Sequence, residues 1–262
     1  GLEKDQLTFF AENNAVKKVS RRDLGISLAE KWHGATTVSS TMHIAHTAGI
    51  PVFATGGIGG VHRGGDYSFD VSQDLTALAT IAMIVISAGC KAILDIPKTL
   101  EMMETLGITV LGYGVDEFPA FYSRCSGYFG IHRVDTPGGV ATIYKNNISA
   151  GLLSSVLVAN PVPKDNEIST DEIESIIEAA CETAKALKVT GKELTPFLLK
   201  NITKHTKYKL INIDNLGING DYIESQAFAY LAIRSYLKKN ISFPSTTGVK
   251  LSVTGGEMFE NF

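Results

Sequence analysis

A glycine-rich block at residues 55–65, TGGIGGVHRGG, is the stretch of the sequence whose composition points most clearly to chemistry. Its closely spaced glycines remove side chains where the backbone would approach a ligand, and their N–H groups can bind an anion. His62 and Arg63 add hydrogen-bond donors and positive charge suited to phosphate. The spacing matches neither the GxxxxGKS/T phosphate loop nor the GxGxxG dinucleotide motif. We interpret the block as a ligand-binding loop of another kind rather than as a flexible turn.

Two carboxylates follow this block. Asp70 and Asp74 lie on either side of Ser72, which has the side chain expected at the N-terminal cap of a helix. Carboxylate oxygens and waters suit a hard divalent cation such as magnesium or manganese. Capping by Ser72 and a favourable interaction of Asp74 with the helix dipole explain the same residues without a metal. Taken alone, the pattern favours that structural explanation.

Lys91 follows an apolar, β-branched run at 81–87 and a short turn. A lysine at the end of a buried strand can lose hydration, which favours the neutral amine and allows it to act as a nucleophile or Schiff-base former. The ordinary alternative is a surface lysine whose stem lies along apolar atoms. The position after a buried strand slightly favours a catalytic role.

A small basic group early in the chain suits a few phosphate contacts to a small molecule, and it consists of Lys17, Lys18, Arg21 and Arg22. His43 and His46 lie three residues apart on an expected helix. No third metal ligand lies nearby in the sequence, so packing or surface roles are the better interpretation of the two histidines.

The remaining titratable residues are not selected by any spacing. Asp116, Glu117 and His132 can serve as acids or bases, and Cys125 needs a paired base that the sequence does not identify. The chain has 3 cysteines and no CxxC pair, so neither a zinc site nor a disulfide framework is indicated. A reducing cytoplasm is the expected setting.

The segments that must position these residues alternate between strand and helix patterns. Strands are expected at 50–55, 81–87, 108–113 and 155–159, and helices from 72, over 97–106 and 140–150, from 169 to 187, and from 195. This alternation predicts an α/β fold with a parallel or mixed sheet and helices on both faces, α/β/α. Ligands of such sheets bind at the carboxyl ends of the strands, where the block and Lys91 fall. A helix expected at 221–238 adds a mostly helical C-terminal appendage.

Composition limits the class of protein. The chain has 262 residues with 24 Lys and Arg, 27 Asp and Glu and 44% apolar residues, which suits a globular domain with a substantial core. A net charge of −3 argues against nucleic acid as a partner, because neutralising phosphates needs a basic face. No run approaches the roughly 20 apolar residues of a membrane span, so no membrane partner is expected.

Residues 1 to about 206 resemble the pseudouridine-5′-phosphate glycosidases. The resemblance is carried by the glycine-rich block and by the segments 18–24, 34–38, 52–64, 69–75, 88–91, 118–121, 158–161 and 195–199. The opening motif of that family, which carries a proton-donor glutamate, and the asparagines of its uracil pocket have no counterpart here. We therefore expect a glycosidase-like domain over 1–210 that is incomplete at its N-terminus.

Residues 211–262 instead resemble the C-terminal end of anhydro-N-acetylmuramic acid kinase, in the segments 217–221, 224–232 and 244–248. The phosphate-binding segments of that kinase are absent, so the resemblance does not imply kinase activity. A sugar-kinase-like protein is accordingly the weakest of the functional hypotheses.

The glycosidase resemblance implies reversible cleavage of the C-glycosidic bond of pseudouridine 5′-phosphate to ribose 5-phosphate and uracil, a step of nucleoside catabolism. Lys91 matches the nucleophile, which holds the opened sugar as an imine, and Asp70 matches the carboxylate associated with Mn²⁺ or another divalent cation. The resemblance also implies a homotrimer. The positions matching or expected to line the substrate pocket are Lys18, Val38, Thr55, His62, Ser72, Gln73 and Asp74. The alternative hypothesis is a catalytically inactive remnant that only binds phosphosugars.

Overall fold

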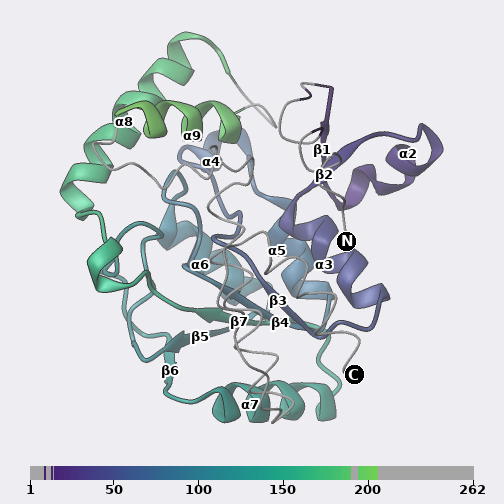
Figure 1. Ribbon diagram of the computed structural model, residues 1–262. Helices are drawn as coiled ribbons and strands as arrows, with labels where there is room; N and C mark the ends of the chain where they lie inside the picture. Colours follow the sequence, from purple (N-terminus) through teal and green to yellow (C-terminus); the bar gives the residue numbers. More distant parts are fainter. Residues whose placement is uncertain (1–8, 10–12, 14, 190–193, 206–262) are drawn as a thin grey trace.

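A five-stranded sheet forms the centre of the computed structural model, which describes residues 9, 13, 15–189 and 194–205 (Figure 1). Its strands are all parallel and follow the order β3-β4-β7-β5-β6. They are β3 (Val52–Ala54), β4 (Ile84–Ser87), β5 (Thr109–Tyr113), β6 (His132–Val134) and β7 (Val156–Ala159). Four of them confirm strands expected from apolar runs, while β6 was not expected because two of its three residues are polar and exposed.

Alternate residues of the strands enter two separate hydrophobic cores. Ile84 and Ile86 of β4 lie in one core with Val156 and Val158 of β7. Val85, between the two isoleucines, lies in the other core. Both strands are buried at every position, as expected for the centre of a parallel sheet covered on both faces.

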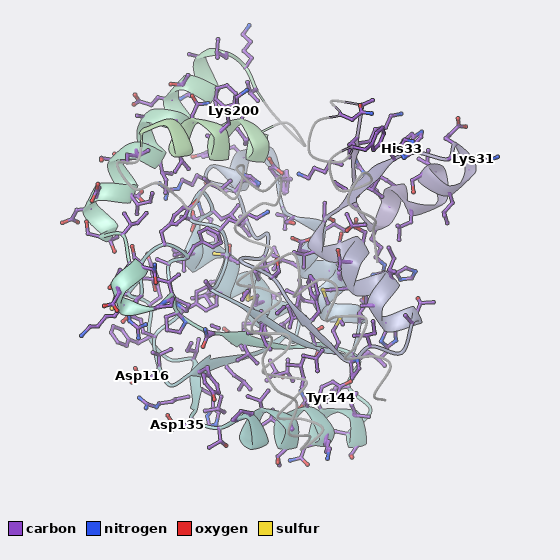
Figure 2. All side chains as sticks on the ribbon, in the orientation of Figure 1. Lys31, His33, Asp116, Asp135, Tyr144 and Lys200 are labelled. Carbon is purple, nitrogen blue, oxygen red and sulfur yellow. The ribbon has the colours of Figure 1, made fainter. Side chains whose placement is uncertain are left out.

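Helices cover both faces, which confirms the α/β/α prediction. The helix α7 (Pro137–Ser149) covers one face, and the hydroxyl of Tyr144 donates a hydrogen bond to the carbonyl of Ala82 at 3.2 Å (Figure 2). The opposite face carries most of the others (Figure 1), which are α3 (Val38–Thr47), α5 (Gln73–Thr80), α6 (Ile96–Thr105), α8 (Thr170–Ala186) and α9 (Leu194–His205). Two short elements, α4 (Gly65–Ser68) and the 3₁₀ turn η2 (Lys164–Asn166), lie in connections.

Side-chain caps fix the starts of three expected helices. Ser72 accepts from the N–H of Asp74 at the start of α5, and Ser169 accepts from the N–H of Glu172 at the start of α8. At α6 the carboxylate of Asp95 accepts from the N–H of Lys98, and Pro97 lies in the first turn.

A small lobe precedes the sheet and was not expected from the sequence. It contains two parallel strands, β1 (Lys17–Val19) and β2 (Gly34–Thr36), with the 3₁₀ turn η1 (Arg21–Asp23) and the helix α2 (Leu24–Ala29) between them. Figure 2 shows Lys31 and His33 at the outer side of this lobe. Because β2 leads directly into α3, the lobe is attached to the helical layer that covers the sheet.

The expected C-terminal appendage, with its helix at 221–238, lies outside the described residues. Within the part of the chain that the structure describes, no helix combines the length and the apolar character that crossing a membrane requires.

Leu157 gives a test of the two-core arrangement, because it is fully buried in the central strand β7. We expect Leu157→Ala to lower the free energy of unfolding by about 2–5 kcal/mol, the range for a cavity left by a buried leucine. Leu153→Ala is the control, since Leu153 is 70% exposed. We expect it to change stability by less than about 0.5 kcal/mol. Equal urea midpoints for the two variants would contradict the assigned core.

Candidate active site

Backbone hydrogen bonds continue the pairing of β3 and β4 beyond the ends of the strands. Ile58 in the glycine block donates its N–H to the carbonyl of Gly89 at 3.1 Å, and its own carbonyl accepts from the N–H of Lys91 at 3.0 Å. Thr55, directly after β3, donates to the carbonyl of Ile86 at 3.0 Å. The glycine block and the turn before Lys91 are therefore held side by side at the carboxyl edge of the sheet.

A second pairing follows immediately and brings His62 to the same place. The N–H of Asp95 donates to the carbonyl of Val61 at 2.9 Å, and His62 forms an antiparallel bridge with Leu94. Leu94 in turn donates its N–H to the carbonyl of Lys91. The turn from Lys91 to Leu94 therefore brings Lys91 close to His62.

His62 is the point at which the charged candidates converge. It is 8% exposed, and burial lowers the pKa of its imidazole because the charged form loses hydration. The negative charge of Asp70 opposes this shift in the pKa of His62, and the positive charges of Lys18 and Lys91 add to it. Charged residues from three separate segments, Lys18, Asp70 and Lys91, therefore lie close enough to His62 to influence its pKa. With its pKa lowered, the imidazole is neutral near pH 7.

Asp70 is joined to His62 through its backbone. Its carbonyl accepts the N–H of His62 at 3.0 Å, and its own N–H is directed at the hydroxyl of Ser68. Its carboxylate accepts no hydrogen bond from the described residues. Phe69, just before it, is exposed and has a φ of 54°, a left-handed conformation that turns the chain back toward the site.

Asp74 has a different role, because both of its carboxylate oxygens accept backbone hydrogen bonds. Oδ1 accepts from the N–H of Ser39 at 2.9 Å, and Oδ2 accepts from the N–H of Gly59 at 2.8 Å. Ser39 lies in the first turn of α3, whose N-cap residue Thr37 supplies no side-chain cap. The buried carboxylate of Asp74 therefore caps α3 from α5 and fixes the glycine block to both helices.

Three further predicted residues lie on or beside the helices that Asp74 connects, α3 and α5. Ser72 donates its N–H to the carbonyl of Gly60 at 2.9 Å, and the side-chain carbonyl of Gln73 accepts from the N–H of Arg22 at 3.2 Å. Val38 is the first residue of α3 and is buried. These contacts join α5 to the glycine block and to the small lobe that carries Lys18.

The glycines are required by packing against protein rather than by an open approach for a ligand. A Cβ atom at Gly57 would lie 2.6 Å from a ring carbon of Phe121, and one at Gly60 would lie 2.5 Å from the hydroxyl of Thr99. At Gly59 the N–H donates to Asp74, so it is not available to an anion. At these three glycines the close approach that the sequence suggested for a ligand is made by protein atoms.

Three of the four side chains in the basic group expected to contact phosphate have separate partners within the protein. The ammonium of Lys17 lies 3.7 Å from the centre of the Trp32 ring, and Arg21 donates to the hydroxyl of Thr80 at 2.9 Å. Arg22 forms an ion pair with the adjacent Asp23. Lys18, in contrast, acts on His62.

The two helical histidines are confirmed as surface residues, because His43 and His46 are both exposed on α3. Among the described residues, no group of three or more His, Cys, Asp or Glu side chains is arranged to hold a metal ion.

The other candidates lie in the connection between β5 and β6. The carboxylate of Glu117 accepts the N–H of Ser126 at 2.6 Å, which gives it a structural role in the loop. The pKa of Cys125 is raised, first by loss of hydration and then by Glu117, which disfavours the thiolate. His132 is exposed at the start of β6, and Figure 2 shows Asp116 at the outer edge of the sheet.

Phe121 is a residue of this site that reasoning from residue chemistry did not single out. It is buried with a φ of 66°, and its N–H donates to the carbonyl of Ala88 at 3.2 Å while its ring packs against Gly57. A buried aromatic residue in a left-handed conformation persists only where its surroundings hold it. The sequence pointed to Phe121 only through the family segment 118–121. Its packing role could not be predicted, because it depends on contact with Gly57, which is distant in the sequence.

The chain matches the sequence model of the family described as "Indigoidine synthase A like protein" over residues 1–219. It is 50% identical to a pseudouridine-5′-phosphate glycosidase of Petrotoga mobilis over 207 residues, which are 79% of this chain and 68% of that protein. The chain belongs to the pseudouridine-5′-phosphate glycosidase family. A glycosidase of this family from Deinococcus radiodurans is also 50% identical, over 79% of this chain and 66% of its own length.

Two solved structures share the fold. The prealnumycin C-glycosynthase in complex with ribulose 5-phosphate is 34% identical, with a TM-score of 0.72 over 78% of this chain and 67% of that one. An indigoidine synthase A-like protein of Thermotoga maritima is 37% identical, with a TM-score of 0.71 over 90% of this chain and 73% of that one. The glycosidase family, the glycosynthase and this chain thus share one α/β scaffold.

The two neighbouring carboxylates, which sequence alone could not separate, are expected to respond differently to amidation. In Asp74→Asn one backbone N–H faces an amide NH₂ group, so we expect stability to fall by about 1–3 kcal/mol, the cost of an unsatisfied buried donor. Asp70→Asn removes a carboxylate with no such partners among the described residues and should leave the urea midpoint nearly unchanged. Equal losses of stability would contradict the assignment of Asp74 as the structural clamp.

The convergence on His62 is tested by its titration, followed by NMR in metal-free buffer. Lys18→Met removes a positive charge that lowers the pKa of His62, so that pKa should rise. Lys17→Met is the matched control, because the neighbouring lysine lies over Trp32 and should leave the titration unchanged. If Lys17→Met changed the pKa of His62 and Lys18→Met did not, the position of the small lobe described above would be wrong.

Proposed function

We propose that this chain cleaves the C-glycosidic bond of pseudouridine 5′-phosphate reversibly, giving ribose 5-phosphate and uracil. The observation that carries the proposal is the convergence of Lys91, His62, Lys18 and Asp70 in a chain 50% identical to a pseudouridine-5′-phosphate glycosidase. The likeness to a glycosynthase crystallised with ribulose 5-phosphate supports a phosphosugar as the ligand. The site also lies at the carboxyl ends of parallel strands, where ligands of such sheets bind.

The proposed chemistry uses Lys91 as the nucleophile. Its amine forms a bond to C1′ of the ribose while the C1′–O4′ bond breaks and O4′ takes up a proton. The nitrogen lone pair then forms a C=N bond as the bond between C1′ and the uracil ring breaks, and the uracil carbon gains a proton. Water finally hydrolyses the imine and restores the amine. A C-glycoside offers no heteroatom to leave, so the nitrogen lone pair supplies the electrons that drive the cleavage, and the uracil carbon, as it gains its proton, takes up the pair of the broken bond.

The neighbouring residues suit this role for Lys91. A neutral His62 adds no further positive charge beside Lys18 and Lys91, and it remains able to accept or donate a proton. Lys18 supplies a positive charge for the phosphate of the substrate. Thr55 follows β3 directly and lies at the same edge of the sheet.

Asp70 is the residue that we propose to hold a divalent cation such as Mn²⁺. Its carboxylate accepts no hydrogen bond from the described residues, and hard divalent cations bind through one or two carboxylates with water or substrate oxygens completing the shell. A cation there would supply positive charge to the oxygen atoms of the substrate. Asp74, whose two oxygens are already engaged, would act by orienting the glycine block.

A second candidate function is binding of phosphosugars without release of uracil. Formation of the imine on Lys91 and protonation of the uracil carbon are separate chemical steps, and the second needs a positioned acid. A site that binds the phosphosugar can therefore carry out the first step without the second. The two candidate functions therefore differ in whether the bond to uracil is cleaved after the phosphosugar has bound.

Borohydride trapping with ribose 5-phosphate tests the proposal. We expect a reduced adduct on Lys91 by peptide mass mapping, no adduct in Lys91→Met, and an unchanged adduct in Lys17→Met. Release of uracil from pseudouridine 5′-phosphate, followed by chromatography, then separates the candidates. An adduct without uracil would support binding alone, and the absence of any adduct on Lys91 would overturn the imine mechanism.

A further inference from the structure

Arg63 follows His62 directly, and its guanidinium is engaged by protein atoms rather than left open for a phosphate. Nη1 and Nη2 donate to the two carboxylate oxygens of Glu174, with a distance of 2.9 Å from Nη2 to Oε2. Nη2 also donates to the carbonyl of Ala92 at 3.2 Å. This fork-to-fork arrangement fixes the plane of the guanidinium as well as its position.

The bond to Ala92 connects the two halves of the site. Ala92 follows Lys91 in the chain, and Arg63 follows His62, so the guanidinium spans from the segment of the histidine to the segment of the lysine. The backbone pairs at Ile58 and Val61 already hold these segments together. Arg63 adds a side-chain connection between the same segments.

Glu174 belongs to α8, a helix that is firmly anchored. Ile173 and Ile177 on the same helix are buried in the core beneath it. Glu178 and Cys181 follow Glu174 on the same face of α8, and both lie near Arg63. The hydrogen bond from Arg63 to Glu174 is the main reason that the pKa of Arg63 is raised, so the guanidinium stays charged at every working pH.

We propose that Glu174 is a positioning residue: it holds the guanidinium of Arg63 on the carbonyl of Ala92 and thereby fixes Lys91 relative to His62. The proposal rests on the proposed function, in which Lys91 attacks the sugar. It replaces the expectation that Arg63 binds phosphate, since both terminal nitrogens of its guanidinium already donate to Glu174 and Ala92.

Glu174→Gln tests the proposal, because glutamine keeps the shape but loses the charge and one acceptor oxygen. We expect kcat for uracil release and the rate of adduct trapping on Lys91 to fall by about 10- to 100-fold, the scale of a small misplacement of a reacting group. KM and the melting temperature should change little. Glu178→Gln is the matched control: Glu178 lies on the same face but accepts no hydrogen bond from Arg63, whose acceptors among the described residues are Glu174 and Ala92. The loss of its charge should leave both rates unchanged.

Arg63→Lys separates the two roles of the arginine, because one ammonium cannot hold Glu174 and Ala92 in the same geometry. We expect it to lower kcat as Glu174→Gln does. If Arg63 instead bound phosphate, Arg63→Lys would raise KM while Glu174→Gln left kcat intact, and that result would overturn the proposal. A fall in melting temperature with unchanged kcat would also overturn it, since it would show a purely structural ion pair.

Hydrogen exchange keeps this proposal separate from the proposed function. Loss of the Glu174 contact should speed amide exchange in the segment 88–95 relative to Glu178→Gln, whatever the turnover. If the wild-type chain traps no adduct and releases no uracil, the proposed function fails, and exchange in this segment still decides whether Glu174 holds it. Equal exchange in the two variants would refute the positioning role.

Discussion

One buried carboxylate holds the parts of this site in a common frame. Asp74 lies in α5 and accepts backbone hydrogen bonds from the start of α3 and from Gly59 in the glycine block. Because β2 runs directly into α3, the same carboxylate also sets the place of the small lobe that carries Lys18. The convergence of Lys18 on His62 depends on this joint, since the two residues belong to segments that share no strand pairing.

Strong local signals made the main sheet and the starts of its helices predictable. Strands such as β4 and β7 are continuous apolar runs, and Ser72 and Ser169 have the side chains that cap helices. The strands β1 and β2 escaped prediction because each has three residues and is mostly exposed. Their formation depends on pairing with one another rather than on any periodic pattern.

The sequence predicted that the glycine block and Lys91 lie at the carboxyl edge of the sheet, but it did not predict which residues contact one another there. Lys91 and His62 stood out because they follow strands at the edge where ligands bind. The partner that engages Arg63 could not be foreseen, because Glu174 lies 111 residues further along the chain on an ordinary amphipathic helix. In the same way, the sequence suggested that Gly57 and Gly60 leave room for a ligand, whereas the structure shows that Phe121 and Thr99 pack against them.

The hydrogen-bonded pairing between the glycine block and the turn before Lys91 also limits how this fold can vary in length. Inserting or deleting one residue in either segment would shift Ile58 against Gly89 and Lys91, and the next pair at Val61 would lose its register as well. Neither segment can change length alone. The connection between β5 and β6 has a pairing of its own, an antiparallel bridge between Glu117 and Phe129, and it forms no strand pairing with the glycine block. A change in the length of this connection would therefore leave the register of the block that carries His62 intact.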